Sequence, residues 1–124
     1  MPTARSNVEE APDLGLLQGT LDLMILKALS WGPMHGFAVA KWVRSTTDDV
    51  LQIDDGALYP ALHRMEHRGL IDADWDLTEN KRRAKYYRLT AKGREELRFR
   101  VTSWDRYSSA VAKVIHATVQ PSVT

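Results

Sequence analysis

The spacing of the apolar residues changes near the middle of the chain, and this change restricts the possible folds more than any other feature. Up to Met65 the apolar residues recur every three or four positions, as Leu58, Leu62 and Met65 do, which is typical of helices with one buried face. Between Ile71 and Asp76 apolar and acidic residues alternate, which is typical of a half-buried strand. Helices therefore come first in the chain, and strands follow.

Two helices are expected in the first part of the chain. The first begins after Gly15 and spans "LLQGTLDLMILKAL", whose apolar residues cover more than one face, so we expect two of its sides to be buried. The second spans "MHGFAVAKWVRSTT", and its inward residues are expected to be Phe37, Val43 and either Val39 or Ala40.

A third helix, in "DDGALYPALHRMEHRGLI", contains a proline near its start. Asp54 or Asp55 can cap this helix, because a carboxylate oxygen accepts a hydrogen bond from a free amide of the first turn. Pro60 lacks the N–H that would donate to the carbonyl of Gly56, and the loss is small because the helix has only just begun there. Gly69 is expected to end the helix.

Two strands and one long helix complete the chain. The second strand contains "KYYRL", and the polar segment "TENKRRA" between the strands is expected to be a hairpin tip. Three helices followed by such a hairpin form the layout of a winged helix-turn-helix. We therefore expect a mainly α fold with a two-stranded β wing, followed by a long C-terminal helix with Thr90 as its cap.

Apolar residues in the final helix repeat every seven positions, stepping by four and by three residues in turn. Such a repeat keeps one seam of a helix facing a partner helix. We therefore expect the chain to form a homodimer through this seam. Its positions are Leu97, Val101, Trp104, Ser108, Val111 and Ile115.

The composition indicates one folded domain, because the 124 residues are 44% hydrophobic and 27% charged. We expect a flexible arm over residues 1–15, the winged helix-turn-helix over 16–89, the dimerisation helix over 90–117 and a tail over 118–124. The chain has no cysteine, which excludes disulfides and thiolate metal sites and fits the reducing cytoplasm. We expect neither a signal peptide nor a membrane span.

Basic residues are concentrated from the hairpin tip onward, although the formal net charge is only +1. Nine basic and two acidic residues lie between Lys81 and Arg100, which favours a nucleic-acid partner. In a helix-turn-helix, side chains near the start of the recognition helix reach the bases and phosphates of double-stranded DNA, and a basic wing contacts phosphates or the minor groove. The expected DNA-binding residues are Tyr59, His63 and Arg64 on the third helix, His35 at the start of the second, and Lys81, Arg82, Arg83 and Lys85 in the wing.

Each of these residues also has a structural interpretation. Tyr59 can cover the second helix as a half-buried aromatic, His35 can serve only as a helix cap, and the basic cluster can be a solvated charge run. His63 and His67 are spaced to share a metal ion, but the sequence offers no third ligand, so we expect no metal and no cofactor. No catalytic arrangement is recognisable in the sequence, and we expect the protein not to be an enzyme.

Trp104 occupies a seam position that in a short coiled coil usually holds Leu or Ile. Two copies, one from each subunit, would meet near the dimer axis and leave a slot with aromatic walls. The alternative is that Trp104 belongs to an ordinary interface core.

Four segments taken together resemble the PadR family of bacterial transcriptional regulators, over about Leu16 to Ile115: "LLQGTLDLMILKAL", "GPMHGF", "GALYPALHRMEHRGLI" and "RRAKYYRLTAKG". The short final helix is similar to that of the subfamily with a single C-terminal dimerisation helix. The resemblance implies a homodimeric repressor of a pseudo-palindromic operator. It assigns the family's DNA-contacting tyrosine to Tyr59 and the basic wing to residues 81–85.

In multidrug-binding members of this family, paired tryptophans of the C-terminal helix hold a flat aromatic compound at the dimer centre. The resemblance assigns this role to Trp104 and places Asp22 and Leu23 of the first helix beside it. Ser108 stands where the drug-binding type tends to have an acidic residue, which argues against a cationic ligand. We therefore expect a ligand-responsive repressor in the cytoplasm. The alternative is a protein-interaction module whose basic wing binds an acidic partner.

Overall fold

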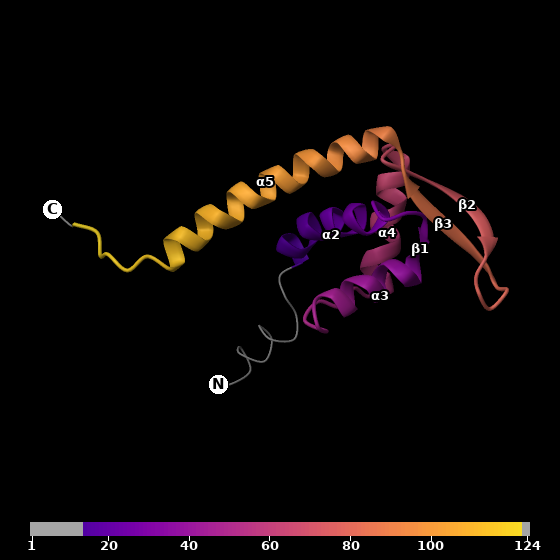
Figure 1. The fold of residues 1–124 in the computed structure, drawn as a ribbon, viewed down its shortest axis with the longest axis horizontal. Helices are drawn as coiled ribbons and strands as arrows, with labels where there is room; N and C mark the ends of the chain where they lie inside the picture. The colour runs from indigo at the N-terminus through magenta and orange to yellow at the C-terminus, as the bar shows by residue number, and fades with distance from the viewer. Residues whose placement is uncertain (1–13, 123–124) are drawn as a thin grey trace.

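The computed structural model describes residues 14–122, and Figure 1 shows how its elements are arranged. Its helices and strands are, in chain order, α2 (Leu14–Leu29), β1 (Met34–His35), α3 (Gly36–Thr46), α4 (Asp55–His67), β2 (Ile71–Leu77), β3 (Arg83–Leu89) and α5 (Ala91–Ile115). The mainly α winged helix expected from the sequence is confirmed. The predicted arm lies outside the described residues, apart from Leu14 and Gly15 at the start of α2.

The sheet has three antiparallel strands in the order β1-β3-β2, one more than the sequence predicted. The added strand β1 is two residues long and pairs Met34 with Tyr87 and His35 with Tyr86. A strand this short has no alternating pattern, which is why the sequence did not indicate it. Because β1 leads directly into α3, the pairing attaches the start of that helix to the wing.

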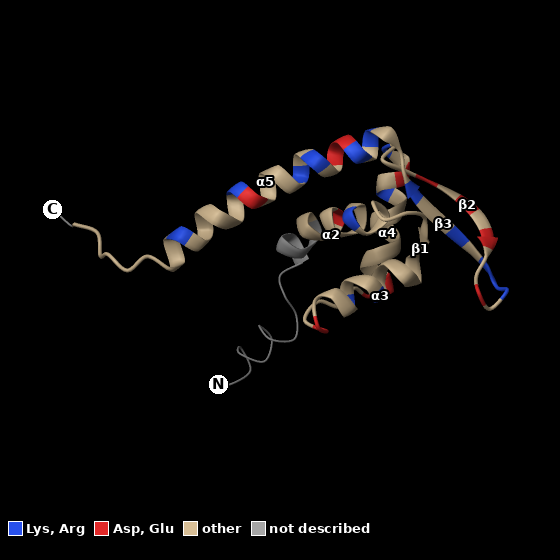
Figure 2. Ribbon diagram, viewed as in Figure 1, with Lys and Arg blue, Asp and Glu red and all other residues tan. Residues whose placement is uncertain are grey.

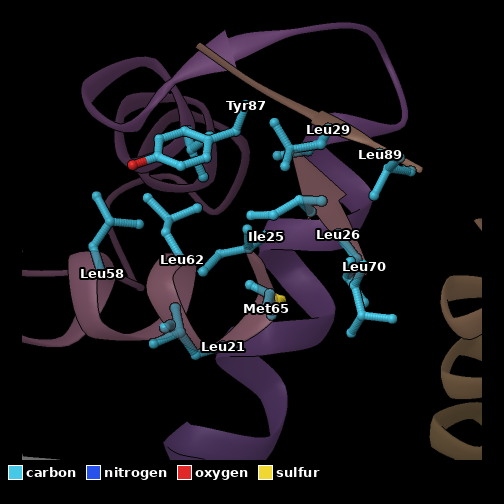
Figure 3. Close-up of a cluster of buried hydrophobic side chains, with 14 residues drawn as sticks. Leu21, Ile25, Leu26, Leu29, Leu58, Leu62, Met65, Leu70, Tyr87 and Leu89 are labelled. Carbon is cyan, nitrogen blue, oxygen red and sulfur yellow. The ribbon is translucent and has the colours of Figure 1, made fainter. Parts of the chain in front are cut away.

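The core lies between α2, α4 and the sheet, as the close-up in Figure 3 shows. The predicted stripe of Leu58, Leu62 and Met65 on α4 is confirmed, since each of these side chains is 0% exposed. They pack with apolar residues of α2, such as Ile25 and Leu26, which are also fully buried. Burying a side chain of this size contributes about 1.5–3 kcal/mol, so this cluster fixes α4 on the fold.

The ends of α4 are set by local hydrogen bonds. Of the two candidate caps, Asp54 is the one used, and its Oδ1 accepts a hydrogen bond from the amide of Ala57 at 2.9 Å. At the other end Gly69 has a φ of 78°, and the amide of Leu70 donates to the carbonyl of Met65 at 2.9 Å. This is the left-handed termination that glycine adopts most easily, so the predicted stop at Gly69 is confirmed.

Helix α3 presents its valines to the core and its phenylalanine to the outside. Val39 and Val43 are 0% and 2% exposed, as predicted, but Phe37 is 69% exposed and the expectation that it points inward is wrong. Residues two apart on a helix are separated by about 200°, so Phe37 cannot share a face with Val39. The ring of Phe37 instead stacks against that of His35, with the centroids 6.3 Å apart.

Helix α5 starts against the domain and then extends away from it (Figure 1). The predicted cap is confirmed, because Thr90 Oγ1 accepts a hydrogen bond from the amide of Gly93 at 3.0 Å and donates to the carbonyl of Gly69 at 2.6 Å. The beginning of α5 packs on α2 and β3. No helix within residues 14–122 is long and apolar enough to cross a membrane.

Candidate nucleic-acid interface

A broad open hollow of about 1050 Å³ lies between the start of α3, the outer face of α4 and the hairpin. Side chains from all three elements line it, so residues far apart in the sequence share one surface. Of the predicted DNA-binding residues, the lining includes His35, Tyr59, His63, Arg82, Arg83 and Lys85. Arg64 and Lys81 do not line it.

Tyr59 and His63 present the outer face of α4 to this hollow. His63 is exposed, and Tyr59 is 38% exposed. The end of the Tyr59 ring lies against Gly36 at the start of α3, so this side chain also covers part of the second helix. The structural interpretation of Tyr59 therefore holds in part, while its outer side is accessible from solvent.

His35 connects α3 with the wing. Its Nδ1 accepts a hydrogen bond from the amide of Ala38 at 3.1 Å, so the helix-cap interpretation of His35 is confirmed. Its ring also meets the edge of Tyr86 on β3, with the centroids 5.3 Å apart. Because Nδ1 accepts this bond, the other ring nitrogen carries the proton in the neutral side chain. A contact between His35 and DNA stays a prediction.

The hairpin tip is shorter than the sequence predicted. Strand β3 begins at Arg83, so the turn covers residues 78–82 and includes Lys81, whose φ is 61°. Arg83 lies on the strand with its guanidinium over the Trp75 ring, 4.8 Å from the centroid. Lys85 also lies on the strand, where its Nζ is 3.3 Å from Glu66 Oε1 on α4. The four predicted wing residues therefore do not form a single cluster at a turn.

Ion pairs neutralise three of the nine basic residues of this run, Lys85, Arg88 and Arg100. Figure 2 shows where the basic and acidic residues lie along the ribbon. Arg88 contacts Asp72 at 2.8 Å and Asp74 at 3.0 Å across the hairpin, and Arg100 Nε lies 2.6 Å from Glu96 Oε2. Within residues 14–122, three of the basic side chains at the hairpin end have no ion pair. They are Lys81, Arg82 and Arg83. The end of the wing, beside the hollow, therefore carries positive charge that no carboxylate of the described residues neutralises.

Arg64 is held by an acidic residue of another helix. Its Nη2 lies 3.1 Å from Oδ1 of Asp22, and Arg100 Nη1 on α5 lies 3.9 Å from Oδ2 of the same carboxylate. Through these two contacts Asp22, which is only 8% exposed, links α2, α4 and α5. The structure thus gives Asp22 and Arg64 a role in packing the helices, and the predicted ligand and DNA contacts of these two residues stay predictions.

The predicted seam of α5 carries large apolar side chains at the surface of the single chain. Val101, Trp104 and Val111 are 38%, 40% and 39% exposed, and Ile115 is 68% exposed. Leu97, at the start of the seam, instead packs against the core, and Ser108 is half-buried. Leu23 on α2 is also half-buried. The ring of Trp104 lies 6.4 Å from that of Tyr107.

Two features of this region were missed from the sequence. One is the pairing of β1 with β3, and the other is the contact of Trp75 with Arg83. The alternation of Ile71, Ala73 and Trp75 carried a signal for the second, since a strand places these residues on one face. Within residues 14–122, no group of three His, Asp or Glu side chains is arranged to hold a metal ion.

Comparisons with known proteins identify the family to which this chain belongs. The profile of the transcriptional regulator PadR-like family matches residues 25–99, which is more than half of the chain and includes α3, α4 and the whole wing. The chain belongs to the PadR-like family of transcriptional regulators. The resemblance stated from the sequence is therefore confirmed.

Solved structures of PadR-like and other transcriptional regulators have the same fold. A PadR family transcriptional regulator from Eggerthella lenta is 31% identical and superposes over 94% of this chain and 99% of its own, with a TM-score of 0.73. A PadR-like regulator from Bacillus cereus is 26% identical over 83% of this chain and 98% of its own, with a TM-score of 0.72. A transcriptional regulator from Clostridium thermocellum is 28% identical over 82% and 95%, with a TM-score of 0.73.

Proposed function

We propose that this PadR-like chain is a homodimeric repressor that binds a pseudo-palindromic operator and responds to a small ligand. The observation that carries the DNA-binding part is the hollow between α3, α4 and the wing, where Tyr59 and His63 lie opposite basic side chains without ion pairs. A winged helix-turn-helix contacts DNA with the corresponding elements.

Each element of the hollow has a distinct part in the proposed complex. Helix α4 enters the major groove, where Tyr59 donates a hydrogen bond from its hydroxyl to a phosphate oxygen and His63 contacts a base or phosphate. Lys81, Arg82 and Arg83 contact phosphates or the neighbouring minor groove. His35 sits at the start of α3, where free amides favour a phosphate. Arg64 and Lys85 are held by carboxylates and have a smaller part.

Helix α5 supplies the dimer interface in this proposal. Its exposed seam of Val101, Trp104, Val111 and Ile115 suits a second copy of the same helix, because a seven-residue repeat directs these side chains to one side. Two copies of α4 would then enter successive major grooves, about 34 Å apart. An operator for such a dimer has two related half-sites, which is the basis for expecting a pseudo-palindrome.

Ligand response in this proposal depends on Trp104. A planar apolar molecule held between the Trp104 rings of two subunits would favour one spacing of the α5 helices over another. Since α5 packs on α2, and both are linked to α4 through Asp22, a change in α5 would alter the separation of the two recognition helices. A ligand with equal affinity for both spacings would leave DNA binding unchanged.

Fluorescence anisotropy with a labelled duplex from upstream of the protein's own gene tests the proposal. We expect saturable binding that persists in excess competitor DNA and falls steeply with salt. Tyr59→Phe should bind about tenfold more weakly with an unchanged unfolding temperature, because it removes one hydrogen bond to a charged group. Binding that occurs only at low salt and without selectivity would instead favour a module for an acidic protein partner.

A further inference from the structure

Gly36, the first residue of α3, lies directly beneath the end of the Tyr59 side chain. A Cβ atom added at Gly36 would be 2.8 Å from Tyr59 Cε1, 2.8 Å from the hydroxyl oxygen and 3.0 Å from Cζ. Carbon atoms in good contact are about 3.5–4.0 Å apart. The Tyr59 ring therefore occupies space that is free only because residue 36 has no side chain.

The backbone at Gly36 does not itself require glycine. Gly36 lies in helix α3, and it is not among the described residues with positive φ. Alanine is more favourable than glycine inside a helix by about 0.5–1 kcal/mol. Neither the backbone conformation nor helix propensity therefore calls for glycine at this first position of α3, and the glycine permits the contact with Tyr59.

The backbone around Gly36 is fixed on both sides. His35, the preceding residue, pairs with Tyr86 in the sheet and caps α3 through the amide of Ala38. Gly36 itself is buried. Tyr59 is 38% exposed, and within residues 14–122 its hydroxyl makes no hydrogen bond. If a side chain introduced at residue 36 collided with Tyr59, the tyrosine ring would therefore move and the backbone of α3 would stay in place.

We propose that Gly36 is a positioning residue for Tyr59, which sets where the tyrosine hydroxyl meets a DNA phosphate. This inference rests on the proposed function of Tyr59. The missing side chain lets the ring lie against the start of α3, so the hydroxyl is held beside the hollow and does not swing freely in solvent. A methyl group at residue 36 would push the ring outward and move the hydroxyl from the position that a phosphate contact requires.

The test compares Gly36→Ala, Tyr59→Ala and the double variant with the wild type. Duplex binding is measured by anisotropy at a salt concentration low enough for every variant to bind, and unfolding is followed by calorimetry. We expect Gly36→Ala to unfold at the wild-type temperature or above and to bind DNA about tenfold more weakly. In the Tyr59→Ala background the same change should have no further effect, because no ring is left to displace.

Gly19→Ala is the matched control, because Gly19 also lies in a helix and an added Cβ there has no neighbour within 4 Å. It should bind DNA as the wild type does. Wild-type affinity in Gly36→Ala would overturn the proposal. An equal loss in the presence and absence of the Tyr59 ring would also overturn it, since the methyl group would then act on DNA or on α3 directly.

A measurement without DNA separates this inference from the proposed function. The ring resonances of Tyr59 can be followed by NMR in tyrosine-labelled protein and assigned by their loss in Tyr59→Phe. We expect Gly36→Ala to shift them and Gly19→Ala to leave them in place; unshifted Tyr59 signals in Gly36→Ala would refute the positioning role. If the wild type fails to bind the duplex while the ring still shifts, the proposed function fails and the contact between the two residues stands.

Discussion

Asp22→Asn tests whether burial or distance decides the strength of an ion pair in this fold. Asp22 Oδ1 is 3.1 Å from Arg64 and Oδ2 is 3.9 Å from Arg100, and the Asp22 side chain is 12% exposed. At an effective dielectric constant of about 20 these distances correspond to attractions of about 5 and 4 kcal/mol. Arg64 and Arg100 are 43% and 23% exposed, so water screens a large part of this attraction.

The asparagine also removes the cost of burying a carboxylate, which offsets part of the lost attraction. We therefore expect a net loss of about 2 kcal/mol, between the values for exposed and fully buried pairs. For a chain of this length that is a fall of about 6–10 °C in the unfolding temperature. Calorimetry at one fixed protein concentration measures it, since the stability of a dimer depends on concentration.

Asp49→Asn is the control, because the Arg44–Asp49 pair is shorter, at 2.9 Å, but its side chains are 58% and 69% exposed. Asp49 has a φ of 67°, a conformation that asparagine also tolerates. We expect a change within about 0.5 kcal/mol. Equal losses at Asp49 and Asp22, or a neutral Asp22→Asn, would refute the reasoning from burial.

Three further outcomes are expected. Changing Lys81, Arg82 and Arg83 together to Gln should reduce the slope of log affinity against log salt by about 0.9 for each phosphate that these side chains neutralise in the wild type, and anisotropy titrations at several salt concentrations measure this slope. Trp104→Ala should weaken the dimer about tenfold or more in ultracentrifugation and reduce the calorimetric affinity for planar aromatic compounds. Burial raises the pKa of Tyr87 above its ordinary value of 10.0, because it disfavours the charged form of the hydroxyl. The folding stability that depends on an uncharged Tyr87 is therefore fully present below that pH and is lost as the pH rises through the raised pKa. Urea titrations at several alkaline pH values should therefore show a shallower loss of stability in Tyr87→Phe than in the wild type.

The carboxylate of Asp22 also suggests how a regulator of this size can couple its parts. One acidic side chain contacts an arginine of the recognition helix α4 and an arginine of α5, and it lies on α2 between them. A displacement of α5 would strain or break one of these contacts. The link is short because it consists of side chains from three packed helices.

Local patterns in the sequence were sufficient to predict most of the fold. The stripe of Leu58, Leu62 and Met65, the cap at Thr90 and the stop at Gly69 depend on residues a few positions apart, and all three are confirmed. The sequence also predicted that Tyr59 would lie on an accessible face of its helix. Helical periodicity and capping act over one or two turns, so they can be read before the chain is packed.

The pairing of the charged side chains could not be predicted in the same way. Arg64 and Asp22 are 42 positions apart, and Arg88 and Asp74 are 14 apart, so their pairing depends on how the elements pack. The sequence therefore presented nine basic residues as one run, whereas in the fold Lys85, Arg88 and Arg100 have carboxylate partners and the three basic residues at the end of the hairpin have none within the part of the chain that the structure describes.

Apart from the two-residue strand β1, the sequence by itself determined which helices and strands form and where most of them end, because those choices depend on neighbours along the chain. The tertiary structure decided which charges are free to meet a phosphate, and it placed the Tyr59 ring over Gly36. Both outcomes arise from contacts between residues that meet only when the core of α2, α4 and the sheet has formed.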